Sequence, residues 1–145
     1  MGLYILMMWK RQENLEKHLR NALKNNEFLL YYQPQFDLEK DKISGFEALI
    51  RWDNTELGFV SPDRFIGIAE ETHLIIAIGE WVLKTACVFI KQLHEKGYSK
   101  LTMSVGVEHQ HQLDYLKKHS CQKIQGYLIS RPLTSEKAIE FIKKF

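Results

Sequence analysis

Two charged side chains that could do chemistry together stand in an otherwise apolar stretch, Ile43–Trp52. Glu47 supplies a carboxylate and Arg51 a guanidinium, and the stretch around them is typical of a buried strand. Charges are rarely buried unless they pair, bind a metal or face a cleft. Residues an even number apart on a strand share a face, so we expect both charges, and Leu49 between them, on one face. An ion pair closing the end of an ordinary strand fits the same pattern, and the residues alone leave both interpretations open.

Apolar periodicities predict the elements that would position these charges. Strands are expected at Phe28–Phe36, Ile43–Trp52, Ser99–Val105 and Lys123–Ser130, and helices at Glu13–Asn26, Arg64–Glu71, Leu74–Lys96, His109–His119 and from Thr134 or Ser135 onward. The short polar turn 37–42 predicts that the first two strands are antiparallel neighbours. Strands alternating with long helices predict an α/β fold, with functional groups at strand ends that face the loops.

Composition indicates a globular protein and excludes several classes. The 145 residues suit one domain, with 45% hydrophobic and 26% charged residues. A net charge of +2 gives no strong argument for binding a nucleic acid polymer or an anionic membrane. Cys87 and Cys121 lack metal or disulfide spacing, so a reduced, cytoplasmic setting is expected. The apolar run Leu3–Trp9 is too short to span a membrane and is expected to pack against another surface.

A set of ordered motifs runs along most of the chain. They are Tyr31-Tyr32-Gln33-Pro34-Gln35, Gly45-Phe46-Glu47-Ala48-Leu49-Ile50-Arg51-Trp52, Pro62-Asp63-Arg64-Phe65-Ile66, Ala69-Glu70, Ile78-Gly79-Glu80-Trp81-Val82-Leu83, Ala86-Cys87, Gly106-Val107-Glu108, Gln112-Leu113, Gln125-Gly126-Tyr127 and Ser130-Arg131-Pro132. This set resembles the EAL domain family, the cyclic di-GMP phosphodiesterases of bacterial signalling. The resemblance covers residues 12–145, which we interpret as the domain, and leaves residues 1–11 as the remnant of a linker.

The resemblance implies a modified TIM barrel that hydrolyses cyclic di-GMP with Mg²⁺ or Mn²⁺, and it assigns roles residue by residue. Glu47 matches a metal ligand, and Glu108 matches an acidic residue near the metal. Gln33, Leu49, Arg51 and Gln125 match positions of the substrate pocket. Glu108 fits equally an acid at the start of the following helix, where the helix dipole favours it.

One departure from the family pattern concerns the middle of the domain. A TIM barrel takes about 250 residues, whereas this chain has 145. Val105 is followed directly by Gly106-Val107-Glu108, which resembles the segment after the seventh barrel strand of the family. We therefore predict a partial barrel of about four strands, with its first strand antiparallel. The missing segment carries an asparagine, a glutamate, paired aspartates and a lysine of the family's site, so we assign no catalytic residue.

Three functions follow from this departure. The first is a cyclic di-GMP-binding or regulatory module with little or no hydrolysis. The second is a metal-dependent phosphodiesterase completed by a homodimer, because two chains with about four strands each would close one barrel and hide open sheet edges. The third is a remnant with no function of its own.

Overall fold

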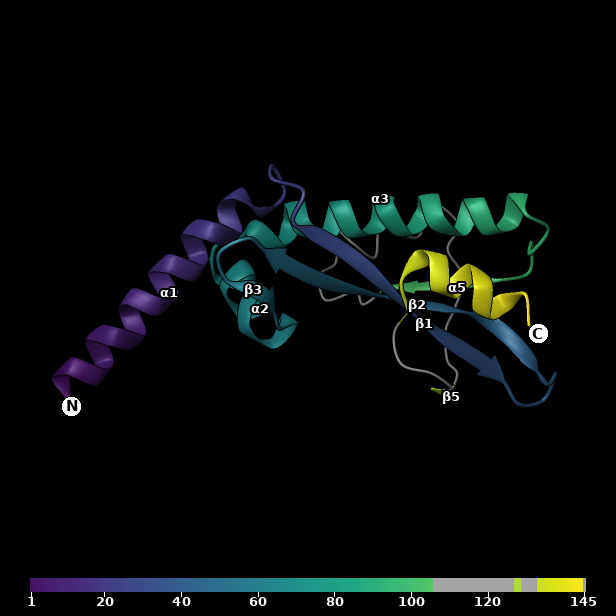
Figure 1. Cartoon of the computed structure of the whole chain (residues 1–145), viewed down its shortest axis with the longest axis horizontal. Helices are drawn as coiled ribbons and strands as arrows, with labels where there is room; N and C mark the ends of the chain where they lie inside the picture. Colours follow the sequence, from purple (N-terminus) through teal and green to yellow (C-terminus); the bar gives the residue numbers. More distant parts are fainter. Residues whose placement is uncertain (106–126, 129–132, 145) are drawn as a thin grey trace. The chain divides into compact units, whose positions relative to one another are not determined.

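The computed structural model describes residues 1–105, 127–128 and 133–144 (Figure 1). The elements of this part of the chain are α1 (Gly2–Ala22), β1 (Phe28–Asp37), β2 (Lys42–Asn54), β3 (Gly58–Val60), α2 (Pro62–Glu71), α3 (Leu74–Glu95), β4 (Thr102–Val105), β5 (Tyr127–Leu128) and α5 (Ser135–Ile142). They divide into two compact units. One comprises Met1–Leu29 with Ile50–Ile78, and the other comprises Leu30–Leu49 with Gly79–Phe145.

An aromatic core holds the first unit together. The rings of Phe28, Trp52 and Phe65 contact one another, with centroids 5.4–6.0 Å apart. Phe65 reaches this core from α2, which begins with Pro62 in its first turn and places Asp63 near the positive end of the helix dipole. The C-terminal half of α1 adds buried apolar side chains, namely Leu15, Leu19 and Ala22.

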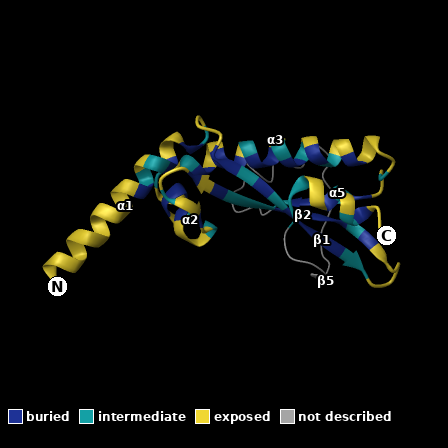
Figure 2. Cartoon of the chain, viewed as in Figure 1, coloured by how far each residue is buried: buried dark blue, intermediate teal, exposed yellow. Residues whose placement is uncertain are grey.

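The second unit packs α3 on the sheet through Phe89. The ring of Phe89 stacks on Tyr32 of β1 at 4.1 Å and meets Phe46 of β2 edge-on at 6.3 Å. Gly97 follows α3 with φ +101°, a conformation that glycine adopts without strain, and so ends the helix as predicted. Figure 2 shows buried residues along the parts of the strands and of α3 that carry these rings.

The described strands form a five-stranded sheet in the order β3-β2-β1-β5, with β4 also paired to β2. Figure 1 shows β1 and β2 running in opposite directions, in agreement with the predicted hairpin. β5 is antiparallel to β1, whereas β4 is parallel to β2. The predicted α/β class is therefore confirmed, and the short strand β3 was not predicted, because three residues carry too little periodicity to be recognised.

One prediction about the N-terminal region is wrong. The helix predicted to start at Glu13 starts at Gly2, because no proline or strong cap interrupts the chain between them. The expectation that Leu3–Trp9 packs against another surface stays a prediction, because each of its side chains is at least 50% exposed in the described part of the chain. The predicted helix His109–His119 and most of the strand Lys123–Ser130 lie outside the described residues. The final helix is confirmed, with Thr134 accepting a hydrogen bond from the Lys137 amide.

Candidate functional site

The parallel pairing of β2 with β4 positions Glu47. Glu47 lies directly opposite Ser104, and Gly45 lies opposite Thr102. Paired residues of neighbouring strands share a face of the sheet, so Ser104 stands beside Glu47. Gly45 permits the close approach of β4, since an added Cβ would overlap the carbonyl oxygen of Thr102 and lie 2.6 Å from its Oγ1 atom.

A second polar pair lies at the same place in the sheet. The amide of Gln35 donates to Ser104 Oγ over 3.2 Å, and Ser104 Oγ donates to Gln35 Oε1 over 3.3 Å. Both side chains are buried, at 6% and 3% exposure. Sequence reasoning did not assign either residue to the site. The signal for Gln35 was its position two residues after Gln33 on a buried strand, and no comparable signal marked Ser104.

Gln33 is buried on β1 without a hydrogen-bond partner. Its side chain is 3% exposed, Nε2 is inaccessible to solvent, and the amide forms no hydrogen bond within the described part of the chain. A buried amide left unpaired is costly, so such a group calls for a partner. Its neighbour Tyr32 is also buried, and this burial raises the pKa of the Tyr32 hydroxyl to about 12, because the phenolate loses hydration.

The other predicted site residues have different environments. Glu47 and Leu49 are half-buried on β2, and the Glu47 carboxylate forms no ion pair or hydrogen bond within the described residues. The ion pair considered for Glu47 is therefore not formed there. Arg51 belongs to the first unit, where it is half-buried and its Nη1 atom donates to the Ile50 carbonyl over 2.9 Å. Glu108 and Gln125 lie outside the described residues.

The described residues do not fit a divalent metal by themselves. Among residues 1–105, 127–128 and 133–144, no group of three or more His, Cys, Asp and Glu side chains converges. Mg²⁺ and Mn²⁺ require several oxygen ligands in an octahedral array, and Glu47 supplies one carboxylate.

The fold and site define an α/β domain with polar side chains on neighbouring strands of its sheet, and two of them, Gln33 and Glu47, have no hydrogen-bond partner within the described residues. A family model, the EAL domain, matches residues 16–105, and the chain belongs to this family. Glu47-Ala48-Leu49 lies within the matched region, in the middle of β2.

Similar proteins include enzymes of cyclic di-GMP metabolism. The signaling protein YkoW of Bacillus subtilis is 45% identical over 94 residues, which are 65% of this chain and 12% of that protein. Cyclic di-GMP phosphodiesterase NbdA of Pseudomonas aeruginosa is 36% identical over 101 residues, 70% of this chain and 13% of NbdA. A solved structure of the PaMucR phosphodiesterase in complex with c-di-GMP has a TM-score of 0.66 and 32% identity. The match covers 74% of this chain and 47% of that one. The chain thus spans about an eighth of the length of YkoW and of NbdA.

Proposed function

We propose that this chain is a degenerate EAL domain that binds cyclic di-GMP as a regulatory module in the cytoplasm, with little or no hydrolysis. The observation that carries the proposal is the buried amide of Gln33, which has no hydrogen-bond partner within the described residues. A ligand oxygen that accepts from Nε2 would remove the cost of this unpaired donor, which is about 1–3 kcal/mol. The family resemblance adds Leu49, Arg51 and Gln125 as further contacts with the ligand, the guanidinium of Arg51 facing a phosphate.

The same residues argue against efficient hydrolysis. Water attacks a phosphodiester anion very slowly, and enzymes lower such barriers by at least about 8 kcal/mol. Two-metal sites do so by placing both ions about 3.5–4 Å apart between several carboxylates. Glu47 and Glu108 are the only metal-ligand candidates that the resemblance assigns to this chain. We further propose that the middle of the domain is missing after Val105, and the family match, which ends at this residue, supports that proposal.

Binding is tested by isothermal titration calorimetry with cyclic di-GMP. We expect saturable heat with the wild-type chain and a loss of at least about tenfold in affinity for Gln33→Ala. Phe59→Ala, an exposed position on β3, is the matched control and should bind like the wild type. Absence of heat with a chain shown to be folded by circular dichroism would disprove binding.

A second test substitutes Glu47, because the two candidate functions predict opposite changes in the affinity for cyclic di-GMP. Without divalent ions its carboxylate repels a phosphodiester, so Glu47→Gln should bind cyclic di-GMP more tightly than the wild type. In a metal-dependent phosphodiesterase the same substitution should weaken binding in the presence of Mn²⁺ and abolish turnover. Turnover that Glu47→Gln leaves unchanged would point to a contaminating enzyme.

The dimeric phosphodiesterase is a second candidate, and the sheet supports it. Among the described strands, β4 pairs with β2 alone and β5 pairs with β1 alone. An open strand edge favours pairing with another strand, so a second copy could extend the sheet toward a closed barrel. A monomer in light scattering at assay concentrations, together with no hydrolysis, would remove this candidate.

A further inference from the structure

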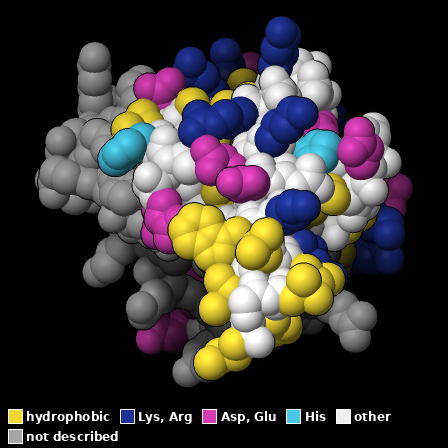
Figure 3. Space-filling view, turned by 90° about the vertical axis from the view of Figure 1, so that its left-hand side faces the viewer, with side chains coloured by type: hydrophobic (Ala, Val, Ile, Leu, Met, Phe, Trp, Pro, Cys, Tyr) yellow, Lys and Arg dark blue, Asp and Glu magenta, His cyan; other side chains and the backbone are white. Residues whose placement is uncertain are grey.

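The N-terminal half of α1 exposes apolar side chains around its whole circumference. From Leu3 to Trp9 every residue is apolar or aromatic, with exposures between 50% and 80%. At about 3.6 residues per turn, this run covers almost two turns and leaves no polar face. Figure 3 shows hydrophobic side chains gathered on the side of the molecule where α1 begins, with both basic (Lys, Arg) and acidic (Asp, Glu) side chains next to them.

This distribution bears on what could cover the run. A second helix packed alongside would cover a single stripe and leave the opposite side chains in water. An apolar medium that surrounds the helix covers all of them. The run is about 10 Å long, a third of the hydrocarbon thickness of a bilayer, so it matches insertion into one leaflet. Tyr4 and Trp9 are residues that favour the membrane interface.

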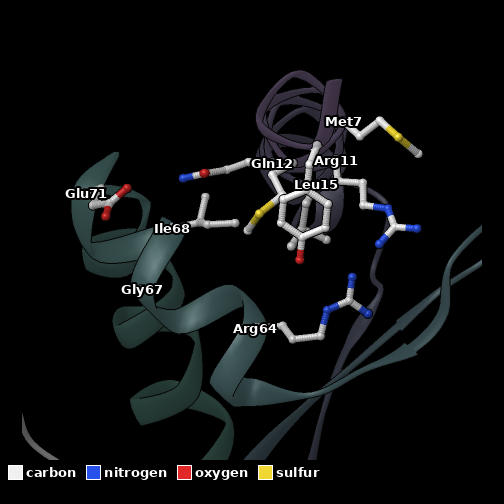
Figure 4. Close-up of a pocket in the computed structure, with 10 residues that line it drawn as sticks. Met7, Arg11, Gln12, Leu15, Arg64, Gly67, Ile68 and Glu71 are labelled. Atoms are coloured by element: carbon white, nitrogen blue, oxygen red, sulfur yellow. The ribbon is translucent and has the colours of Figure 1, made fainter. Parts of the chain in front are cut away.

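A pocket between α1 and α2, with a volume of about 510 Å³, brings two basic side chains close to the apolar run. Arg11 of α1 and Arg64 of α2 line it beside Met7 and Leu15. Figure 4 shows both guanidinium groups at one end of the pocket and Glu71 at the other. Neither arginine forms an ion pair or side-chain hydrogen bond within the described residues. Two neighbouring cations without a counterion repel each other, and an anion placed between them relieves this repulsion.

The charged residues that directly follow Leu3–Trp9 are also positive. Lys10 and Arg11 follow Trp9 directly, and no acidic residue occurs before Glu13. By contrast, Arg20 in the buried half of α1 is paired with Glu16 at 2.5 Å. Although the net charge of the chain is only +2, Lys10 and Arg11 beside the apolar run form no ion pair within the described residues.

We propose that the N-terminal half of α1 docks on an anionic lipid surface. Leu3–Trp9 enters the acyl region, and Lys10, Arg11 and Arg64 contact headgroup phosphates. The proposal does not depend on cyclic di-GMP binding, since it uses none of the residues of the nucleotide proposal, and Gln33, which carries that proposal, lies in the second unit.

Vesicle co-sedimentation of the full chain tests the proposal. We expect strong binding to an equal mixture of phosphatidylglycerol and phosphatidylcholine, and at least about tenfold weaker binding to phosphatidylcholine alone. Leu3→Gln combined with Leu6→Gln should lower the affinity by at least about tenfold, because both side chains leave the acyl region. Ile76→Gln combined with Val88→Gln, at exposed apolar positions of α3, is the matched control and should bind like the wild type.

The basic contacts are tested separately. Arg11→Gln and Arg64→Gln should each weaken binding to the anionic vesicles about fivefold and leave binding to phosphatidylcholine unchanged. Trp9 fluorescence should shift to shorter wavelength on binding, and the shift should vanish in Trp9→Phe. Equal binding of the Leu3/Leu6 variant and the wild type would overturn the proposal. So would a stable dimer in the absence of lipid that this variant converts to a monomer, because a second copy would then be the partner.

Discussion

The C-terminal end and the middle of β2 differ in whether their polar side chains have hydrogen-bond partners. At the C-terminal end, Trp52 packs into the aromatic core, and Asn54 donates to the buried carboxylate of Glu27 while accepting from the amides of Glu56 and Leu57. In the middle of the strand, Glu47 has no such partner within the described residues, and the residue opposite it on β4 is the polar Ser104, which is bonded to Gln35 of β1. The same strand thus contributes to a packed core at its C-terminal end and carries an unpaired carboxylate, Glu47, in its middle.

The comparison teaches how to separate structural from ligand-directed polar groups. Glu27 Oε2 and Trp52 Nε1 are also buried without a partner, yet the rest of each side chain is anchored, by Asn54 and by aromatic rings respectively. The Gln33 amide, by contrast, forms no hydrogen bond in the part of the chain that the structure describes. A buried polar group with two polar atoms is therefore a stronger sign of a ligand when neither atom is held, as in Gln33, than when one atom is held, as in Glu27.

Trp52→Ala should disrupt the aromatic core at the C-terminal end of β2 and cause the largest loss of stability. The side chain is fully buried, and its removal leaves a cavity between Phe28 and Phe65. We expect a loss of about 3–5 kcal/mol in the free energy of unfolding, measured by urea denaturation. Phe59→Ala, at an exposed aromatic position, should change it by less than about 0.5 kcal/mol. A small effect of Trp52→Ala would mean that this core is not packed as described.

Gly45→Ala should disturb the pairing of β2 with β4. The added Cβ would overlap the backbone of Thr102, so the two strands must separate. A loss of about 1–3 kcal/mol in unfolding free energy is expected. Gly67→Ala is the matched control, because nothing lies within 4 Å of a Cβ at that helical position, and it should be neutral or stabilising by up to about 1 kcal/mol. Equal effects of the two substitutions would contradict the close approach of β4.

Asn54→Ala should have an intermediate effect. It removes the partner of the Glu27 carboxylate and the acceptor for two amides of the turn before β3. We expect about 1–3 kcal/mol of destabilisation, since a buried carboxylate loses its hydrogen bond. Asn21→Ala, whose amide donates to the Lys17 carbonyl at an exposed site, should cost less than about 0.5 kcal/mol in the same denaturation experiment. A similar cost for both would show that the Glu27–Asn54 bond adds nothing.

Glu47→Gln should have the smallest effect on stability and so sharpen the comparison. The carboxylate is half-buried and has no partner within the described residues to lose. The melting temperature, measured by differential scanning calorimetry, should fall by no more than about 1 °C or should rise. A clear destabilisation would reveal that the Glu47 carboxylate, like that of Glu27, has a structural role.

The amino-acid sequence by itself determined the class of fold, most element positions and the family. Periodicity placed β1, β2 and α3 within a few residues of their observed bounds, because apolar side chains repeat at the spacing of the element that buries them. The ordered motifs led to the EAL domain, which the family match confirms. Gly97 and Thr134 marked helix ends through their own local conformations.

Only the tertiary structure decided which side chains meet. The bonds between Gln35 and Ser104 join residues from distant parts of the chain, and strand pairing rather than local sequence brings them together. The unpaired state of Gln33 and the exposure of Leu3–Trp9 are likewise properties of what lies around a residue. Residue type and spacing depend on neighbours along the chain, whereas burial and partnership depend on neighbours in space, and no local pattern encodes the latter.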